Sequence, residues 1–200
     1  MKLYIKIGRV FLVSVIAITL LISGCLDNET NKTTPTPEPT IEPTPVVEEN
    51  WLTPAAVVTC CGEEEGFPAS ASIDGNLSTY WGHIKGEAHW IIYDLGSAQN
   101  ISKIRIYTDS GFGGAPCKLF IYTTNNESLL SNGNETKGWQ RAGESGTIPP
   151  SLHWTEVKLT NATGRYLKIY PYTHFKPTGT CGWYFSLGGF REIEYLPREE

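Results

Sequence analysis

The chain has 200 residues, 40% hydrophobic and 18% charged, with 16 basic and 21 acidic residues and a formal net charge of −5. This acidic balance, with no cluster of Lys or Arg, excludes a nucleic-acid-binding role, because neutralising phosphates requires concentrated positive charge. It also disfavours adsorption to an anionic lipid surface.

Residues 1–25 are predicted to be an export signal. Lys2, Lys6 and Arg9 precede an apolar run, residues 10–22, that is shorter than the roughly 20 residues needed to cross a bilayer. The run ends in L-I-S-G-C, which resembles a bacterial-type lipobox. That resemblance implies cleavage before Cys25 and attachment of a diacylglycerol to its thiol. We therefore expect an exported protein anchored to the outer face of the cell membrane; an ordinary secretory signal with a chance cysteine is the alternative.

Residues 26–50 are predicted to be a disordered stalk. This stretch contains T-T-P-T-P-E-P-T-I-E-P-T-P and almost no large apolar side chain. Such a segment buries too little surface to offset its ordering entropy, and its alternating prolines favour an extended polyproline II conformation. We expect it to hold the following domain away from the membrane.

Residues 51–200 are predicted to form one all-β domain. Short β-rich runs alternate with Gly, Asn and Pro clusters, and several alternate apolar and polar residues. In one run, Ile104 and Ile106 should point inward while Lys103 and Arg105 point outward; Val157 and Leu159 should point inward in another. Regularly spaced short strands indicate a sandwich or jelly roll. The predicted strands are 56–59, 89–95, 103–108, 118–123, 155–160, 166–170 and 191–196. Residues 125–150 are expected to be an ordered excursion or a mobile loop.

Four sequence motifs in order resemble one known family. They are D-G-N-L-S-T-Y-W at 74–81, W-I-I-Y-D-L-G with I-S-K-I-R-I-Y at 90–107, G-R-Y-L-K-I-Y at 164–170 and F-R-E-I-E-Y at 190–195. Together they resemble a discoidin domain, also called the coagulation factor 5/8 type C domain, which overlaps a group of galactose-type carbohydrate-binding modules. The resemblance spans about residues 55–196. It implies an eight-stranded antiparallel jelly roll whose loops at one end bind a ligand.

The loop at 74–79 is a candidate cation site. It concentrates oxygen atoms around Gly75, and such loops are either turns held by Asx and Ser/Thr hydrogen bonds or sites for a hard cation such as Ca²⁺. In the resembling family a structural Ca²⁺ often lies under this loop. The resemblance implies ligation by Asp74, Asn76, Thr79 and, from the last strand, Glu192.

Candidate ligand-binding residues lie in the predicted loops. Trp183 and Tyr184 follow glycine and could stack on a sugar, although they could equally pack in the core. Resemblance to the galactose-binding branch implies a role for His83, and Lys85 and Lys118 lie where that branch places further ligand residues. The aromatic and arginine partners of that branch are missing, so a galactose ligand does not follow. Trp81 and Trp90 are expected in the core.

Cysteine usage agrees with export. Setting Cys25 aside, four cysteines remain, and an even number predicts two disulfides with three possible pairings. Because adjacent cysteines rarely bond each other, we expect Cys60 and Cys61 each to bond one of Cys117 and Cys181. A four-cysteine zinc site is the alternative, although the spacings lack a C-x-x-C pair.

Several asparagines lie in N-x-S/T sequons, which mark glycosylated surface loops of secreted chains. The candidates in the domain are Asn100, Asn126, Asn134 and Asn161.

No arrangement typical of a catalytic site occurs, and the chain is predicted not to be an enzyme. The 4 histidines fall in no metal-binding spacing and there is no G-x-S-x-G elbow, although paired carboxylates for glycoside hydrolysis stay open at this stage. We predict a membrane-anchored surface module that binds a carbohydrate or a surface glycoprotein. The rival predictions are a protein-binding adhesion module and a structural module without a glycan ligand.

Overall fold

The computed structural model describes residues 48–83, 89–108, 116–149, 152–175, 181–182 and 189–199, with backbone alone at 174 and 175. These residues belong to one compact unit, Val46–Glu200. The predicted anchor Cys25, nearly all of the predicted stalk, and the predicted ligand residues Lys85, Trp183 and Tyr184 lie outside the described residues. Within the described ranges, no helix has the length and apolar character needed to cross a membrane.

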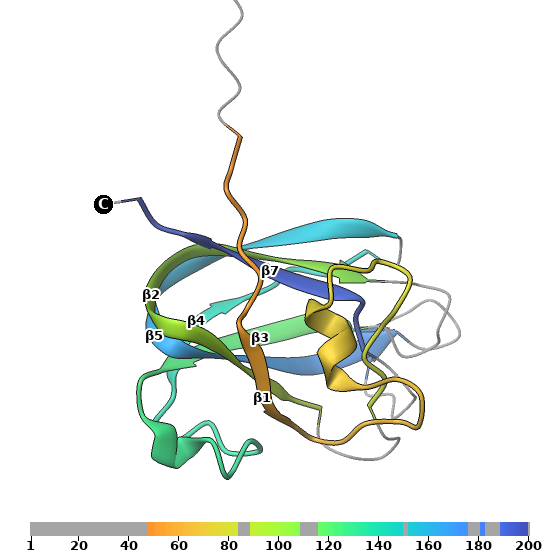
Figure 1. Cartoon of the computed structure of the whole chain (residues 1–200), viewed down its shortest axis with the longest axis horizontal. Helices are drawn as coiled ribbons and strands as arrows, with labels where there is room; N and C mark the ends of the chain where they lie inside the picture. Colours follow the sequence, from red (N-terminus) through yellow and green to blue (C-terminus); the bar gives the residue numbers. More distant parts are fainter. Residues whose placement is uncertain are drawn as a thin grey trace, which may run out of the picture. The chain divides into compact units, whose positions relative to one another are not determined.

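The fold is all-β and antiparallel, as predicted (Figure 1). Two short 3-10 helices, η1 (Ala69–Ile73) and η2 (Glu127–Leu129), interrupt the strands. The described ranges contain seven strands, so the predicted count of eight stays a prediction. These strands are β1 (Ala56–Cys60), β2 (Ile91–Thr108), β3 (Pro116–Thr124), β4 (Gln140–Glu144), β5 (His153–Phe175), β6 (Cys181–Gly182) and β7 (Glu192–Pro197).

The strands β2 and β5 are long and bent, and they pair with each other along most of their length (Figure 1). The first half of β2 also pairs with β1, and its second half pairs with β7, whereas the second half of β5 pairs with β3. Sequence analysis divides each of these long strands into two, and that prediction is wrong. Register shifts, together with Gly96 at φ 84° and Asn161 at φ 52°, bend the ladder without ending it.

The predicted excursion at 125–150 is ordered wherever it is described, and it contains η2 and β4. The strand β4 pairs with β3 at the edge of the sheet. Its sequence, Q-R-A-G-E, has no β-branched or aromatic residue, so no local signal marks it as a strand. Pairing with β3, rather than intrinsic propensity, therefore makes this segment a strand.

The main core lies between the two halves of the bent sheet. Trp81 is fully buried there, as predicted, and Phe190 meets it edge-on with ring centroids 5.5 Å apart. The predicted alternation is confirmed, because Ile104, Ile106, Val157 and Leu159 are buried. Burying a large apolar side chain contributes about 1.5–3 kcal/mol, so these positions determine which face of each strand points inward.

A second, smaller apolar cluster is covered by the excursion. Its buried members are Ile92, Tyr122, Trp139 and Tyr166. Trp90 packs against this cluster, half-buried. Gly133 of the excursion lies so close to the Trp90 ring that a β-carbon there would overlap it. Glycine at 133 thus allows the excursion to close over the cluster.

This second cluster contains a buried cation, Lys168. Its side chain is fully buried, and its Nζ donates a 2.7 Å hydrogen bond to the carbonyl oxygen of Glu135 in the excursion. The Nζ also lies 5.1 Å from the ring centroid of Trp139 and 5.7 Å from those of Tyr122 and Tyr170. Burial lowers the pKa of Lys168 to about 8. The aromatic rings and one carbonyl therefore replace water around this charge.

The segment before β1 is held against β7 (Figure 1). Leu52 and Tyr195 exchange two backbone hydrogen bonds of 2.8 Å. Beside them, the Arg105 guanidinium lies 4.5 Å from the ring centroids of both Trp51 and Trp154. A cation between two indole rings gains from both ring faces, so Trp51 fixes the start of the domain to the sheet.

Candidate functional site

The loop after η1 gathers the predicted cation ligands. Gly75 adopts φ 75°, which a residue with a side chain rarely adopts, and the loop turns back on Asp74. The Asp74 carboxylate accepts hydrogen bonds from the Asn76 N–H at 2.8 Å and from the Thr79 hydroxyl at 2.8 Å. The Thr79 hydroxyl also lies 2.8 Å from the carbonyl oxygen of Asn76. Burial raises the pKa of Asp74, but these hydrogen bonds outweigh it and the net pKa is lowered.

Glu192, the first residue of β7, completes this loop from the other end of the domain. Its side chain is buried, and its Oε1 accepts a 2.6 Å hydrogen bond from the Gly75 N–H. Burial, together with the neighbouring Asp74 carboxylate, raises the pKa of Glu192 to about 7. The structure therefore brings together all four residues of the predicted cation site.

The donor set at this loop fits a hard cation. Two carboxylates lie close together, and a cation between them would remove the repulsion that raises the pKa of Glu192. The remaining oxygens are the hydroxyl of Thr79 and backbone carbonyls, which Ca²⁺ accepts as ligands. Among the described residues, no group of three or more His, Cys, Asp or Glu could hold a metal. The chemistry of the loop thus suits calcium better than zinc, and calcium binding stays a prediction.

The described part of the chain contains one disulfide, Cys117–Cys181, in place of the predicted pairing. The prediction that Cys60 and Cys61 bond these two cysteines is therefore wrong. Cys117 lies near the start of β3 and Cys181 begins β6, and both strands pair with the last residues of β5. This common partner brings the two Cα atoms to 5.9 Å, which is within the range of a disulfide.

The other two cysteines lie at the end of β1. Cys60 carries a free, half-buried thiol that donates a 3.4 Å hydrogen bond to the carbonyl oxygen of Gly62. Burial raises the pKa of this thiol. The backbone N–H of Cys61 donates to the Trp90 carbonyl oxygen at 3.0 Å. The disulfide at Cys117 also removes the four-cysteine zinc alternative, because bonded sulfurs cannot serve as thiolate ligands.

The end of β2 and both ends of β5 lie at one end of the sheet, which we call the loop end (right in Figure 1). The two predicted ligand residues that are described both lie near it. His83 is fully buried, with its ring centroid 3.5 Å from that of the buried His89. Lys118 is half-buried in β3, next to the disulfide, and makes no ion pair with any described residue. Contact of His83 with a ligand would require its surroundings to move, and its role stays a prediction.

A disulfide on one side and a backbone hydrogen bond on the other tie the described residues that flank positions 183–188 to the loop end. On one side, Cys181 bonds Cys117 beside Lys118. On the other side, the Phe190 carbonyl oxygen accepts a 3.1 Å hydrogen bond from the Trp81 N–H. A β-carbon on Gly189 would overlap the Trp81 carbonyl oxygen, so only glycine allows this approach. The described residues that flank positions 183–188 thus contact Lys118's neighbour Cys117 on one side and Trp81 on the other.

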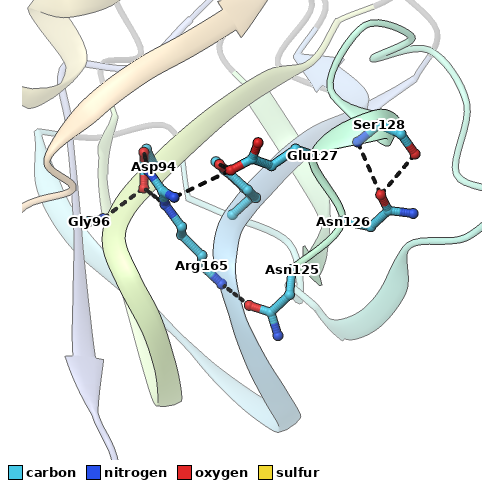
Figure 2. A network of polar contacts seen from close by, with 8 residues as sticks. Asp94, Gly96, Asn125, Asn126, Glu127, Ser128 and Arg165 are labelled. Carbon is cyan, nitrogen blue, oxygen red and sulfur yellow. Dashed lines mark hydrogen bonds and ion pairs between the residues drawn. The ribbon is translucent and has the colours of Figure 1, made fainter.

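A polar network at the opposite end of the sheet was not expected from the sequence. Figure 2 shows Arg165 of β5 against Asp94 of β2, with Nε–Oδ1 2.9 Å and Nη2–Oδ2 2.8 Å. The Arg165 N–H donates to Asn125 Oδ1 at 2.8 Å, and its Nη1 lies 3.4 Å from Glu127 Oε1. The network joins the two long strands to the start of the excursion, and we interpret it as structural. Its residues lie far apart in sequence, so no local motif could identify it.

The four candidate glycosylation residues of the domain have exposed side chains, namely Asn100, Asn126, Asn134 and Asn161. In Figure 2, Asn126 accepts hydrogen bonds from the Ser128 N–H at 3.0 Å and from the Ser128 hydroxyl at 2.8 Å. Exposure is compatible with modification, and glycosylation stays a prediction.

Comparison with known proteins identifies the family. The sequence model of the F5/8 type C domain matches residues 57–184. The nuclear receptor 2C2-associated protein of Danio rerio is 26% identical over 109 residues, covering 54% of this chain and 77% of that protein. The structure is similar to the CBM32 of AlyQ in complex with 4,5-unsaturated mannuronic acid, with TM-score 0.55 and 19% identity over 74% of this chain and 98% of that one.

A second solved structure has the same fold. The family 32 CBM from C. perfringens NanJ in complex with galactose superposes with TM-score 0.52 and is 23% identical, covering 68% of this chain and 90% of that one. The structural likeness concerns the fold, because both identities are low. The family match spans most of the described domain, including the loop at 74–79 and both cysteines of the disulfide. The chain therefore belongs to the F5/8 type C domain family.

Proposed function

We propose that this protein is a cell-surface module that binds carbohydrate at the loop end of its F5/8 type C domain. Two proteins of the same fold were solved with sugars, one with 4,5-unsaturated mannuronic acid and one with galactose. Their ligands support the class of ligand and not the particular sugar, since the chain lacks the aromatic and arginine partners expected for galactose. Catalysis has no support among the described residues.

The Cys117–Cys181 disulfide carries this proposal. It links the strand that contains Lys118 to the chain that leads into Trp183 and Tyr184, two and three residues after Cys181. The bond joins two segments that are 64 positions apart, one with Lys118 and one that precedes Trp183 and Tyr184 in the sequence. A cross-link between two segments reduces the conformational entropy that they lose when a ligand binds and orders them.

We further propose that calcium supports this site from the adjacent loop. Asp74, Asn76, Thr79 and Glu192 would hold the ion, and its charge would offset the two carboxylates. The residues themselves already join the loop after η1 to the start of β7, so the expected role is structural. A cation that binds only the folded domain would stabilise it by mass action.

The carbohydrate proposal is tested on an array of neutral, aminated and acidic oligosaccharides, using the intact chain. We expect binding that is lost in Trp183→Ala and weakened in Lys118→Ala. Trp183→Phe, which keeps an aromatic ring, should retain part of the affinity. Lys103→Ala is the matched control, because Lys103 lies on a different strand with its own ion pairs to Glu49 and Glu156. Absence of any glycan ligand together with capture of a surface protein would favour the adhesion module instead.

Membrane anchoring is proposed from L-I-S-G-C and the proline-rich stretch that follows. Cys25→Ser should leave the precursor unprocessed or release the protein from membranes. The measurement is detergent-phase partitioning together with the intact mass of the mature chain. Unchanged partitioning and processing in the variant would contradict lipid anchoring.

A further inference from the structure

We propose that one face of β3, β4 and β5 is a second carbohydrate-binding site, which takes a neutral oligosaccharide. We call it the aromatic platform and define it by Phe120, Tyr170, Tyr172 and Arg141. It is a different surface from the loop-end site and does not depend on that site binding sugar.

Sheet register places the platform side chains together. Phe120 of β3 is the direct partner of Tyr170 on β5, and Arg141 of β4 is the partner of Tyr122, two residues further along β3. The Phe120 and Tyr172 rings have centroids 4.8 Å apart and planes tilted by 34°. The Arg141 guanidinium carbon lies 4.3 Å from the Phe120 ring centroid. Two strands thus contribute aromatic rings to this surface, and β4 contributes the guanidinium group that lies over one of them.

The platform is the part of this face that the excursion leaves open. Further along the same strands, Tyr122 and Lys168 are covered, and Trp139 of the excursion packs with them. On the platform, Tyr172 is 38% exposed and the Arg141 side chain is 50% exposed, while Phe120 and Tyr170 are half-buried. The aromatic rings of the platform are therefore accessible in part to a small ligand, whereas those under the excursion are not.

The chemistry of the platform fits a neutral sugar. Flat rings can contact the C–H groups of one pyranose face, and phenol hydroxyls can donate to and accept from sugar hydroxyls. Arg141 forms an ion pair with Glu144, so donors and an acceptor lie side by side without net charge. This charge balance favours an uncharged polar ligand over an acidic or a basic one.

The size of the exposed surface argues against a protein partner. A stable protein interface buries about 800 Å² on each side. Among the described residues, the other exposed large apolar side chains are Val58, Leu77 and Leu152, and these lie on other segments. The platform therefore offers one to a few side chains for contact, which matches one or two sugar rings better than a second copy of the chain.

The test measures hexasaccharides of glucose, N-acetylglucosamine, mannose and galactose against the intact chain, by calorimetry and by amide chemical shifts. We expect at least one of them to shift amides of Phe120, Arg141 and Tyr172. Tyr172→Ala should weaken that ligand by about tenfold, the size expected for loss of one aromatic stacking contact. Tyr172→Trp should retain binding, and added salt should change the affinity little.

Matched variants separate the platform from the loop end. Tyr107→Ala removes a half-buried tyrosine that contacts Trp154 on another part of the sheet, and it should leave hexasaccharide binding unchanged. Binding that persists in Trp183→Ala and is lost in Tyr172→Ala would support the platform even if the loop-end proposal fails. Equal binding by Tyr172→Ala and the wild type would overturn the platform. Self-association that disappears in Tyr172→Ala would overturn it too, because this face would then bind another copy of the chain.

Discussion

The carboxylate of Glu192 accepts a 2.6 Å hydrogen bond from the backbone N–H of Gly75, which lies 117 positions earlier in the chain. This contact connects the first residue of β7 to the loop after η1. The same carboxylate lies beside Asp74, and both are predicted cation ligands. The loop is therefore more than a local turn, because its shape depends on a residue near the other end of the domain.

Glu192 predicts a pH dependence that calcium should remove. In metal-free protein the pKa of Glu192 is about 7, above its ordinary value of 4.5, so the native state keeps a proton that the unfolded state loses between these values. The free energy of unfolding should consequently fall as pH rises from 4.5 to 7, by on the order of 2 kcal/mol. Saturating Ca²⁺ should flatten this dependence and raise the melting temperature at pH 7.

Glu192→Gln is the control, since an amide oxygen can still accept from the Gly75 N–H but does not titrate in this range. Its melting temperature should vary less with pH and should not respond to Ca²⁺ or chelator. Denaturant unfolding across the pH series measures the effect. If the stability of the wild-type protein changes neither with chelator nor with pH, the loop is only a hydrogen-bonded turn.

Lys168 predicts the opposite dependence at alkaline pH. Its native pKa is about 8, below the ordinary 10.5, so between these values the unfolded state holds a proton that the native state has lost. Stability should rise with pH across that window. Lys168→Met should abolish the rise and cost little at pH 7, because it removes a buried charge along with its bond to Glu135. Lys158→Met, at an exposed position of the same strand, should leave the dependence intact.

The disulfide predicts that replacing Cys117 or Cys181 destabilises the domain more than replacing Cys60. Cys117→Ser or Cys181→Ser should lower the free energy of unfolding by about 2–4 kcal/mol, since the bond closes a loop of 64 residues. Cys60→Ser should lower the free energy of unfolding by less, because Cys60 forms no disulfide. Peptide mapping under non-reducing conditions should recover the Cys117–Cys181 pair, and thiol labelling of unfolded, unreduced protein should modify Cys60. A peptide that links Cys60 to Cys117 or Cys181 would contradict the assignment.

The Arg165–Asp94 ion pair predicts where the excursion opens first. Arg165→Ala removes the two hydrogen bonds to Asp94 and the contact with Glu127. Amides of residues 125–139 should then exchange with solvent faster, while those of β2 and β7 keep their protection. Lys103→Ala, which removes ion pairs elsewhere on the sheet, should not change exchange in the excursion. Uniform loss of protection would mean that the network stabilises the whole domain.

The sequence predicts well which side chains of a strand point into the core, and predicts poorly where strands end and which strands pair. Alternation alone places Ile104 and Val157 in the core, because burial repeats every second residue along a strand. It does not predict that β2 runs on past Gly96, since a bend there depends on pairing with β5. The burial of Lys168 cannot be predicted from the sequence either, because a lysine in a strand is expected to point outward to solvent.

In the candidate site, too, the sequence identifies residues that are close together in the chain and misses contacts between distant ones. The oxygen-rich loop is recognisable because Asp74, Gly75, Asn76 and Thr79 are close in sequence, and Glu192 is identified only through the family resemblance. The disulfide pairing depends on which strands flank the end of β5, and spacing alone carries no such information. Arg141 joins the platform because β4 pairs with β3, and the sequence of β4 gives no sign that it is a strand.

The fastening of Trp51 and Leu52 has a mechanical consequence. Tension on the chain before Trp51 would first load the Leu52–Tyr195 backbone pair and the stacking of Trp51 on Arg105. Tyr195 belongs to β7, which lies along β2, so the load would be borne by two neighbouring strands. The loop end lies beyond this point of attachment, and its segments are tied down separately by Cys117–Cys181 and by Trp81–Phe190. A pull on the chain before Trp51 would therefore strain β7 and β2 before it disturbed the loop end, where we propose that a ligand binds.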